Sequence, residues 1–414
     1  MAIYEIKDEK EKLILVGVAS SANDDTEQSL DELCDLVDTA GGVVVGRVIQ
    51  RREMIHPATY VGKGKIEEIK ELLWETDADG IVCDDELSHA HTANLTELLD
   101  TKVMDRTLII LDIFAGRAST SEGKIQVELA QLRYRQTQLT GAGKALSRLG
   151  GGIGTRGPGE KKLEMDRRLI KNRIALLNRE LKDVKRHRDL TREQRSRNHM
   201  QVAAIVGYTN AGKSTLLNTL TDAKVLEEDQ LFATLDPTTR NLKLPSGQEM
   251  LVTDTVGFIR KLPHHLIEAF RSTLEEAKYA DLILHVLDSS NPQMDEQMYV
   301  VYETLRKLEV MNKPVITVFN KMDRRGENAL LRDFQADRTV QISAKTGEGI
   351  PELLCAIEQQ LREQKILIER MYPYQESSRV QMIRKYGELL EEHYTEEGIY
   401  IRAYVPKEIY GRSL

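Results

Sequence analysis

Apolar residues recur along the chain in short continuous runs that alternate with segments of helical periodicity. Near the start, LILVGVA (13–19), GVVVGRVIQ (42–50) and GIVCDDE (80–86) are typical of buried strands. The segments DELCDLVDTA and KIEEIKELLWET between them are typical of helices. This alternation predicts a small α/β domain over residues 1–118.

The next region carries two heptad patterns, separated by the glycine-rich stretch GGGIGTRGPGE (150–160). Two long helices joined by residues that cannot continue a helix predict an antiparallel helical hairpin over 119–198, with its tip at 150–159. A surface linker is the alternative, but a flexible linker needs no heptad arm on each side. The heptad positions are Ile125, Leu129, Leu132, Leu139 and Leu146 in the first arm and Leu163, Ile170, Ile174, Leu177, Leu181 and Val184 in the second.

Residues 199–366 return to alternating strands and helices. Each of VAAIVG, MLVTDTVG, LILHVLD and VITVFN is typical of a buried parallel strand, which predicts a doubly wound α/β domain. Beyond Pro373, a helical run at 382–394 and the alternating strand IYIRAYV (399–405) predict a small α+β module over 367–414. The expected fold class is therefore a multidomain α/β protein.

Charge and composition narrow the functional classes. The net charge is −8, but residues 161–200 contain fourteen Lys/Arg and six Asp/Glu, so this segment carries +8 and the rest carries −16. Contact with a polyanion is therefore expected to be local. The chain shows no long uncharged apolar run, no signal-peptide pattern and no Cys or His spacing typical of a metal site, so we expect a cytoplasmic protein without a membrane segment.

The stretch GYTNAGKST (207–215) follows a predicted strand and precedes a helical pattern, which is the setting of a phosphate-binding loop. Lys213 is expected to reach the β- and γ-phosphates as a catalytic residue, and the Ser214 hydroxyl to ligate Mg²⁺. The expected nucleotide contacts are Gly207, Tyr208, Thr209, Asn210, Ala211, Gly212, Lys213, Ser214 and Thr215.

A second motif, DTVGF (254–258), follows the strand MLVT. Asp254 is placed to hold the metal, and the N–H of Gly257 to approach the γ-phosphate as a second catalytic group, with Thr255 and Val256 between them. Many signalling GTPases carry Gln at the next position to orient the attacking water. Here Phe258 can neither donate nor accept a hydrogen bond, so we expect slow hydrolysis by the protein alone.

Two further motifs select the base. NKMD closes the strand VITVFN, and an Asp carboxylate there pairs with guanine N1–H and the exocyclic amine, whereas adenine presents no such donor pair. SAK follows the strand TVQI and can place a backbone N–H on guanine O6. The expected contacts are Asn320, Lys321, Met322, Asp323, Ser343, Ala344 and Lys345. The substrate and product are therefore expected to be GTP and GDP.

Between the first two motifs lies LFATLDPTTR (231–240). A threonine here is expected to sense the γ-phosphate through Mg²⁺ and to order the loop only in the triphosphate state. Thr234 is the preferred ligand, with Phe232 and Ala233 beside the nucleotide, while Thr238 and Thr239 remain alternatives. A hydroxyl-rich turn without a ligand is also compatible with the pattern.

These motifs, together with GGGIGTRGPGE before a basic heptad helix and HPATYVGKGK (56–65) in the first domain, resemble the HflX family of ribosome-associated GTPases over almost the whole chain. Where relatives read GPGETQLE, this chain reads GPGEKKLE (157–164), which adds positive charge.

The resemblance implies binding to the large ribosomal subunit, stimulation of the GTPase there and dissociation of stalled 70S ribosomes under stress. It also implies that the hairpin tip reaches RNA near the peptidyl-transferase region, and that the glycine-rich, basic motif YVGKGK (60–65) of the first domain binds ATP or RNA phosphate. The implied RNA contacts are Gly151, Gly152, Gly154, Arg156, Pro158, Lys161 and Lys162.

Alternative interpretations of these segments and of the function stay open. The basic segment could be a solvated helix face, and YVGKGK could be an ordinary turn with helix capping. A GTP-dependent RNA remodeller or subunit-assembly factor would share the GTPase domain and the basic arm. A regulatory switch that recruits a protein partner would share the GTPase domain only.

Overall fold

The computed structural model describes residues 10–20, 25–149, 158–197, 200–221, 231–232, 234–261, 263, 266, 276–310, 312–325, 331–406 and 410. The contacts divide the chain into two compact units. The first comprises Met1–Arg188, Glu228–Asp236 and Ile259–Thr273, and the second comprises Asp189–Glu227, Pro237–Phe258 and Leu274–Leu414. The expected multidomain α/β class is confirmed.

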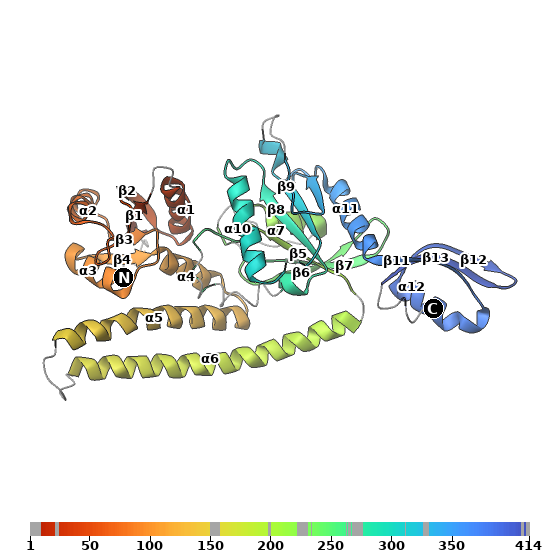
Figure 1. The fold of residues 1–414 in the computed structure, drawn as a ribbon, viewed down its shortest axis with the longest axis horizontal. Helices are drawn as coiled ribbons and strands as arrows, with labels where there is room; N and C mark the ends of the chain where they lie inside the picture. The colour runs from red at the N-terminus through yellow and green to blue at the C-terminus, as the bar shows by residue number, and fades with distance from the viewer. Residues whose placement is uncertain are drawn as a thin grey trace, which may run out of the picture. The chain divides into compact units, whose positions relative to one another are not determined.

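The first unit contains a parallel four-stranded sheet of order β2-β1-β3-β4 (Figure 1). A helix follows each strand, as the alternation of apolar runs predicts. The strands are β1 (Lys12–Ala19), β2 (Val43–Arg51), β3 (Gly80–Cys83) and β4 (Lys102–Asp105), and the helices are α1 (Thr26–Thr39), α2 (Lys63–Thr76), α3 (His89–Leu99) and α4 (Arg106–Arg117).

A buried ion cluster lies at the carboxyl edge of this sheet. Arg106, 1% exposed, donates to Asp84 Oδ1 at 2.7 Å and to Glu32 Oε1 at 2.6 Å. Ser29 Oγ donates to the second Asp84 oxygen at 2.7 Å. Because Asp84 is fully buried, its charge depends on these partners.

The predicted hairpin is present as α5 (Ser121–Leu149) and α6 (Pro158–Arg197), which lie side by side in Figure 1. Arg173 pairs with Glu128 at 2.7 Å and Arg188 with Glu122 at 2.9 Å, so the two helices run antiparallel. Tip residues 150–157 lie outside the described residues, as do the side chains of 158–163.

The second unit is built on a six-stranded sheet of order β10-β9-β8-β5-β7-β6, in which β6 alone runs antiparallel to its neighbour. This confirms the doubly wound prediction. The strands are β5 (Val202–Gly207), β6 (Thr238–Lys243), β7 (Glu249–Asp254), β8 (Leu282–Asp288), β9 (Val315–Asn320) and β10 (Arg338–Gln341). The helices are α7 (Lys213–Thr221), α10 (Met294–Lys307), η1 (Met322–Arg324) and α11 (Ile350–Glu363).

The C-terminal part contains an antiparallel sheet of order β11-β13-β12 with α12 packed on it. The helix expected over 382–394 is wrong beyond Tyr386. There Gly387 ends α12, and residues 388–395 pair with β13 because cross-strand contacts outweigh their local helical pattern. The bounds are β11 (Lys365–Tyr372), η2 (Tyr374–Glu376), α12 (Ser377–Tyr386), β12 (Glu388–Thr395) and β13 (Gly398–Pro406), the last confirming the predicted strand.

Among the helices of the described residues, none is long and apolar enough to cross a bilayer. Cys34, Cys83 and Cys355 are all free thiols. No cluster of three or more His, Cys, Asp or Glu side chains suited to a metal occurs within the described ranges.

Replacing Asp84 by Asn should destabilise the first unit by about 3 kcal/mol, because the buried Arg106 would lose one of its two carboxylate partners and keep only Glu32. Hydrogen exchange of the β1 and β3 amides would measure this loss. Asp77→Asn is the matched control, since Asp77 is 96% exposed and pairs with Lys12 only at the surface, so the change should be below about 0.5 kcal/mol. Equal effects of the two substitutions would contradict the assignment.

The second unit should lose stability in acid through His285, which is buried in β8 with neither ring nitrogen hydrogen-bonded to a described residue. Burial lowers its pKa to about 4, Asp333 opposes this shift and Lys213 adds to it. The unfolded chain binds the proton more tightly, so stability should fall as the pH drops below about 6.5, by about 2 kcal/mol at pH 5.

The variant His285→Leu should remove this acid-dependent loss. Exchange of the β9 amides at pH 8 and pH 5 would measure it. An unchanged pH dependence in the variant would show that another group is responsible.

Candidate nucleotide-binding site

The phosphate-loop motif occupies the predicted strand, loop and helix setting. Gly207 ends β5 and Lys213 begins α7, so the backbone N–H groups at the start of α7 point into the loop. Asn210 and Gly212 take left-handed backbone angles, with φ of +59° and +91°. A side chain at Gly212 would collide with the amide nitrogen of Asn320, so the turn needs glycine there.

Lys213 and Gly257 are brought together as the sequence predicts. Lys213 is buried, and its Nζ donates to the carbonyl of Tyr208 at 2.6 Å. Burial lowers the pKa of Lys213 to about 8, while Asp254 opposes the shift and Lys321 adds to it. A Cβ at Gly257 would lie 2.9 Å from Lys213 Nζ and 2.8 Å from Cγ2 of Thr209, so only glycine lets this backbone come so close.

Ser214 and Asp254, the expected metal ligands of the second unit, are in direct contact. Ser214 Oγ donates to Asp254 Oδ2 at 2.8 Å, where β7 ends. A hydroxyl and a carboxylate oxygen are the donor types that hard divalent cations prefer. Thr255 instead binds the neighbouring strand β5, since its hydroxyl donates to the carbonyl of Ile205 at 2.7 Å.

The base-reading motifs also meet. Ser343 Oγ donates to Asp323 Oδ1 at 2.7 Å. This hydrogen bond from Ser343 lowers the pKa of Asp323, outweighing the opposing effect of desolvation, so the carboxylate is held ionised. Lys321 pairs with Asp288, the last residue of β8, at 2.8 Å. Sequence reasoning missed Asp288, although its place at the end of a buried parallel strand is a signal for a site residue.

Asn320 links the phosphate loop to the base-reading SAK segment. Its amide nitrogen donates to the carbonyl of Ala211 at 2.9 Å, and its amide oxygen accepts from the N–H of Ala344 at 2.9 Å. Both bonds are buried. The sequence groups Asn320 with the base-reading residues, whereas its side chain holds the phosphate loop and the SAK loop together.

The segment LFATLDPTTR is divided between the units at Asp236 and Pro237. Thr234 therefore belongs to the first unit, while Ser214 and Asp254 belong to the second, and its role as a metal ligand stays a prediction. Ala233 lies outside the described residues. Of the alternatives, Thr238 begins β6, and the Thr239 hydroxyl pairs with that of Thr253 at 2.9 Å across the strands.

Phe258 is held by its backbone. Its N–H donates to the carbonyl of Gly207 at 3.1 Å, and its carbonyl accepts from the N–H of Thr209 at 2.8 Å. The ring is buried, 2% exposed. A buried ring with no polar atom cannot orient a water molecule.

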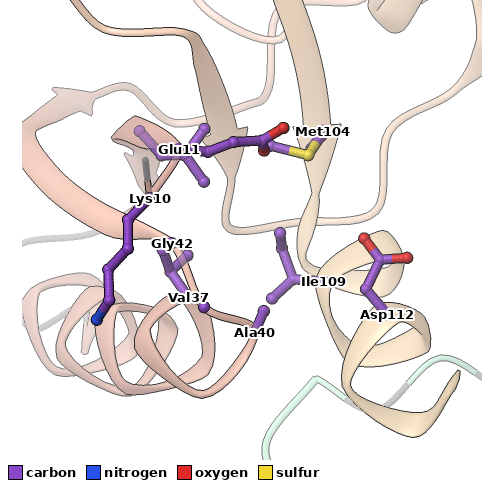
Figure 2. Close-up of a pocket in the computed structure, with 10 residues that line it drawn as sticks. Lys10, Glu11, Val37, Ala40, Gly42, Met104, Ile109 and Asp112 are labelled. Atoms are coloured by element: carbon purple, nitrogen blue, oxygen red, sulfur yellow. The ribbon is translucent and has the colours of Figure 1, made fainter. Parts of the chain in front are cut away.

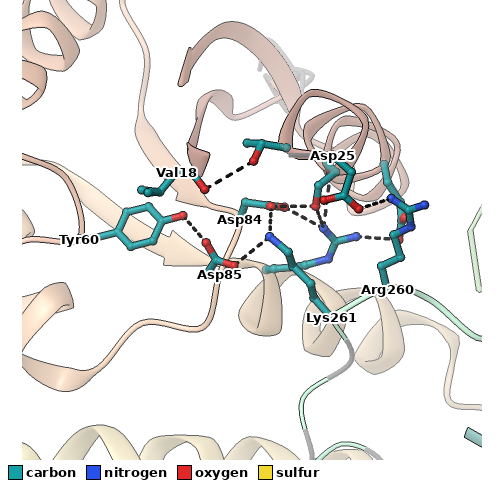
Figure 3. A network of polar contacts seen from close by, with 11 residues as sticks. Val18, Asp25, Tyr60, Asp84, Asp85, Arg260 and Lys261 are labelled. Carbon is teal, nitrogen blue, oxygen red and sulfur yellow. Dashed lines mark hydrogen bonds and ion pairs between the residues drawn. The ribbon is translucent and has the colours of Figure 1, made fainter. Parts of the chain in front are cut away.

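The two residues after Ile259 bind the acidic edge of the first unit's sheet (Figure 3). Arg260 pairs with Asp25 at 2.7 Å, and Lys261 Nζ contacts Asp84 at 2.5 Å and Asp85 at 2.8 Å. Burial acts to lower the pKa of Lys261, but Asp84 and Asp85 outweigh it and raise the pKa. Nothing in the sequence near DTVGF indicates these partners, which lie between 176 and 235 positions away.

The YVGKGK segment has the geometry of an ordinary helix start. Gly62 is the N-cap residue of α2, and its N–H donates to Gln50 Oε1 at 2.7 Å. Lys65 pairs with Glu68 of the same helix at 2.8 Å. These contacts are typical of an ordinary turn with helix capping. Binding of ATP or RNA phosphate there stays a prediction.

A hollow of about 290 Å³ in the first unit lies at the amino ends of its strands (Figure 2). Glu11 on its rim pairs with Lys102 at 2.8 Å. Doubly wound sheets bind ligands at the carboxyl edge, which is the opposite side. This hollow therefore does not form part of the nucleotide site.

Geometry and motifs together define a phosphate-loop GTPase, and comparisons with known proteins agree. Three family profiles match in succession. They are described as GTP-binding GTPase N-terminal over residues 27–115, GTP-binding GTPase Middle Region over 117–195 and 50S ribosome-binding GTPase over 202–321.

Curated relatives identify the family. GTPase HflX of Lacrimispora saccharolytica is 66% identical over 99% of this chain and 97% of its own length. GTPase HflX of Caldanaerobacter subterraneus is 50% identical over 99% of this chain and 94% of its own length. GTPase HflX of Escherichia coli is 42% identical over 87% of this chain and 85% of its own length. The chain belongs to the GTPase HflX family, and it binds and hydrolyses GTP, as the motifs predict.

Among solved structures, a GTP-binding protein from Sulfolobus solfataricus in complex with GDP is similar to this chain. It is 24% identical with a TM-score of 0.44, and the match covers 84% of this chain and 98% of that one.

Proposed function

We propose that this GTPase binds the large ribosomal subunit in the cytoplasm and dissociates stalled 70S ribosomes in a cycle governed by its nucleotide. The observation that carries the proposal is the presence, in one chain, of a guanine-nucleotide site and a long antiparallel hairpin with a basic second helix. A pure protein-recruiting switch needs no such arm. The match of residues 202–321 to a 50S ribosome-binding GTPase profile supports the same partner.

The hairpin has the charge that RNA binding requires. Arg168 and Lys171 are exposed on α6 beside a hollow of about 390 Å³ that Arg167, Gln136 and Glu164 complete. Lys and Arg side chains bind RNA through its phosphates. The glycines of the tip would let a narrow backbone enter a crowded RNA cavity, with Gly151, Gly152, Gly154, Arg156, Pro158, Lys161 and Lys162 as the proposed contacts.

At the nucleotide, the second unit would supply most of the groups. Lys213 Nζ would leave the Tyr208 carbonyl for the β- and γ-phosphates, whose charge would restore its usual pKa. The N–H of Gly257 would bind the γ-phosphate. Asp323 would accept from guanine N1–H and the exocyclic amine, and a backbone N–H of the SAK segment (343–345) would donate to guanine O6.

The oxygen donors Ser214 and Asp254 fit Mg²⁺, with Thr234 as the proposed third ligand. A bound Mg²⁺ would neutralise charge on the β- and γ-phosphates. Because the Phe258 ring is buried and apolar, the protein alone lacks a water-orienting group at this position. We therefore expect the ribosome to complete the hydrolytic site, and hydrolysis to release the factor after the subunits part.

Asp323→Asn should shift the preference from guanine toward xanthine nucleotides, because an amide cannot accept both guanine donors but can donate to the xanthine O2. GTP affinity should fall about 10- to 100-fold, as expected for lost charge-assisted hydrogen bonds. Titration with fluorescent GTP and XTP analogues would measure both effects. Asp295→Asn, an exposed carboxylate in the first turn of α10, is the control. An unchanged preference would contradict the base-reading assignment.

Large ribosomal subunits should stimulate GTP hydrolysis at least tenfold, and deletion of 150–159 should remove the stimulation while basal hydrolysis persists. Steady-state phosphate release with and without subunits measures this effect. Stimulation that survives the deletion would count against the hairpin as the ribosome-binding element. No stimulation of the intact protein would favour the protein-recruiting switch.

The dissociation step needs its own assay. A non-hydrolysable GTP analogue should support separation of 70S particles in a sucrose gradient, and Lys213→Ala should abolish it. If the protein acts only on immature subunits and leaves 70S particles intact, it is an assembly factor or RNA remodeller instead.

A further inference from the structure

The loop before β6 is packed onto the first unit through an aromatic contact. Phe232, 3% exposed, packs edge-on against Phe114 of α4 with ring centroids 4.6 Å apart. Its backbone is left-handed, with φ of +55°. A bulky residue holds such a conformation only where its surroundings stabilise it, and at Phe232 the Phe114 ring provides that stabilisation.

Asp236, at the end of the same loop segment, binds the start of the hairpin. Its Oδ2 accepts from the Ser119 N–H at 3.0 Å, the Ser119 hydroxyl at 2.7 Å and the Thr120 N–H at 2.8 Å. Its Oδ1 accepts from the Thr120 hydroxyl at 2.5 Å. Thr120 in turn accepts from the Gly123 N–H at 2.9 Å, so the carboxylate and the threonine together cap α5.

Gly123 provides the space for this carboxylate. A Cβ at Gly123 would collide with Oδ1 of Asp236. Glycine within a helix costs about 1 kcal/mol relative to alanine, so its presence in the first turn of α5 calls for a compensating contact. Close approach of Asp236 is that contact.

We infer that Asp236 is a positioning residue for the GTPase cycle, which couples the nucleotide-sensing loop to the hairpin. The inference rests on the proposed function, in which Thr234, two residues away, orders the loop in the triphosphate state. Helix α5 begins at the Asp236 cap and ends at Leu149, next to the glycine-rich stretch. Loop and tip thus adjoin opposite ends of one helix.

The coupling has a definite direction. Ordering of the loop by the triphosphate holds Asp236 against Ser119 and Thr120, and so strengthens the cap. By linkage, a partner that binds and orders the hairpin favours the ordered loop by the same factor.

Hydrogen exchange of the full-length protein tests this coupling without ribosomes. Peptides that span residues 119–124 should exchange about tenfold more slowly with a non-hydrolysable GTP analogue than with GDP, within the usual range of coupling between sites. In Asp236→Ala the difference between the two nucleotides should disappear. Equal exchange in both nucleotide states of the unaltered protein would overturn the inference.

A matched pair of glycine substitutions supplies the control. Gly123→Ala should abolish the nucleotide-dependent difference, although alanine favours the helix itself, so the loss cannot be attributed to unfolding. Gly116→Ala in α4, where an added Cβ would meet nothing within 4 Å, should leave the difference intact. If Gly123→Ala behaves like Gly116→Ala, the cap is not what couples the loop to α5.

The double variant gives an independent check. Without the Asp236 carboxylate there is no collision at position 123, so Gly123→Ala should not speed exchange of the 119–124 peptides any further in the Asp236→Ala background. A further rise in their exchange rate with the GTP analogue bound would overturn the proposed contact. The two proposals can fail separately. If large subunits do not stimulate GTP hydrolysis but the nucleotide-dependent exchange difference is present, the proposed function is wrong and the coupling through Asp236 still holds.

Discussion

The side chain of Asn320 is the interaction on which the nucleotide site depends. Parallel strands deliver the phosphate loop, DTVGF and NKMD to one edge of the sheet, but strand pairing alone does not fix the loops that leave that edge. The Asn320 amide donates to one loop and accepts from another, both in buried positions. Because an unsatisfied buried amide is costly, the phosphate and base ends of the site are held as one piece.

The same reasoning separates what the sequence could predict from what it could not. The strand and loop motifs were predictable because each is local: glycines at fixed spacing, a lysine and a carboxylate that follow apolar runs. The strand at 388–395 was not, because its pairing with β13 is a tertiary contact that outweighs a helical pattern. The Asn320 bridge was missed for the same reason, since it joins residues 109 and 24 positions away.

The acidic edge of the first sheet shows how a long-range charge contact escapes sequence analysis. Asp84 and Asp85 follow a parallel strand, where doubly wound folds bind their ligands. Here the charges that meet them are Arg106, which binds Asp84, and Lys261, which binds both carboxylates and lies four residues after Gly257 of DTVGF. The ligand-binding edge of this domain is thus satisfied internally, which removes a reason to seek a small-molecule ligand there.

The Asp236 cap contributes less free energy than the buried Asp84 cluster, because the cap lies at an exposed helix start. Asp84 is fully buried and Arg106 nearly so, so separating them would cost several kcal/mol. Asp236 binds backbone N–H groups and hydroxyls at an exposed helix start, where such a contact contributes about 0.3 to 2 kcal/mol. A contact of that size can be made and broken within a nucleotide cycle, whereas the Asp84 cluster must persist through it. The buried cluster therefore maintains the fold, and the exposed cap is suited to carry the change of state.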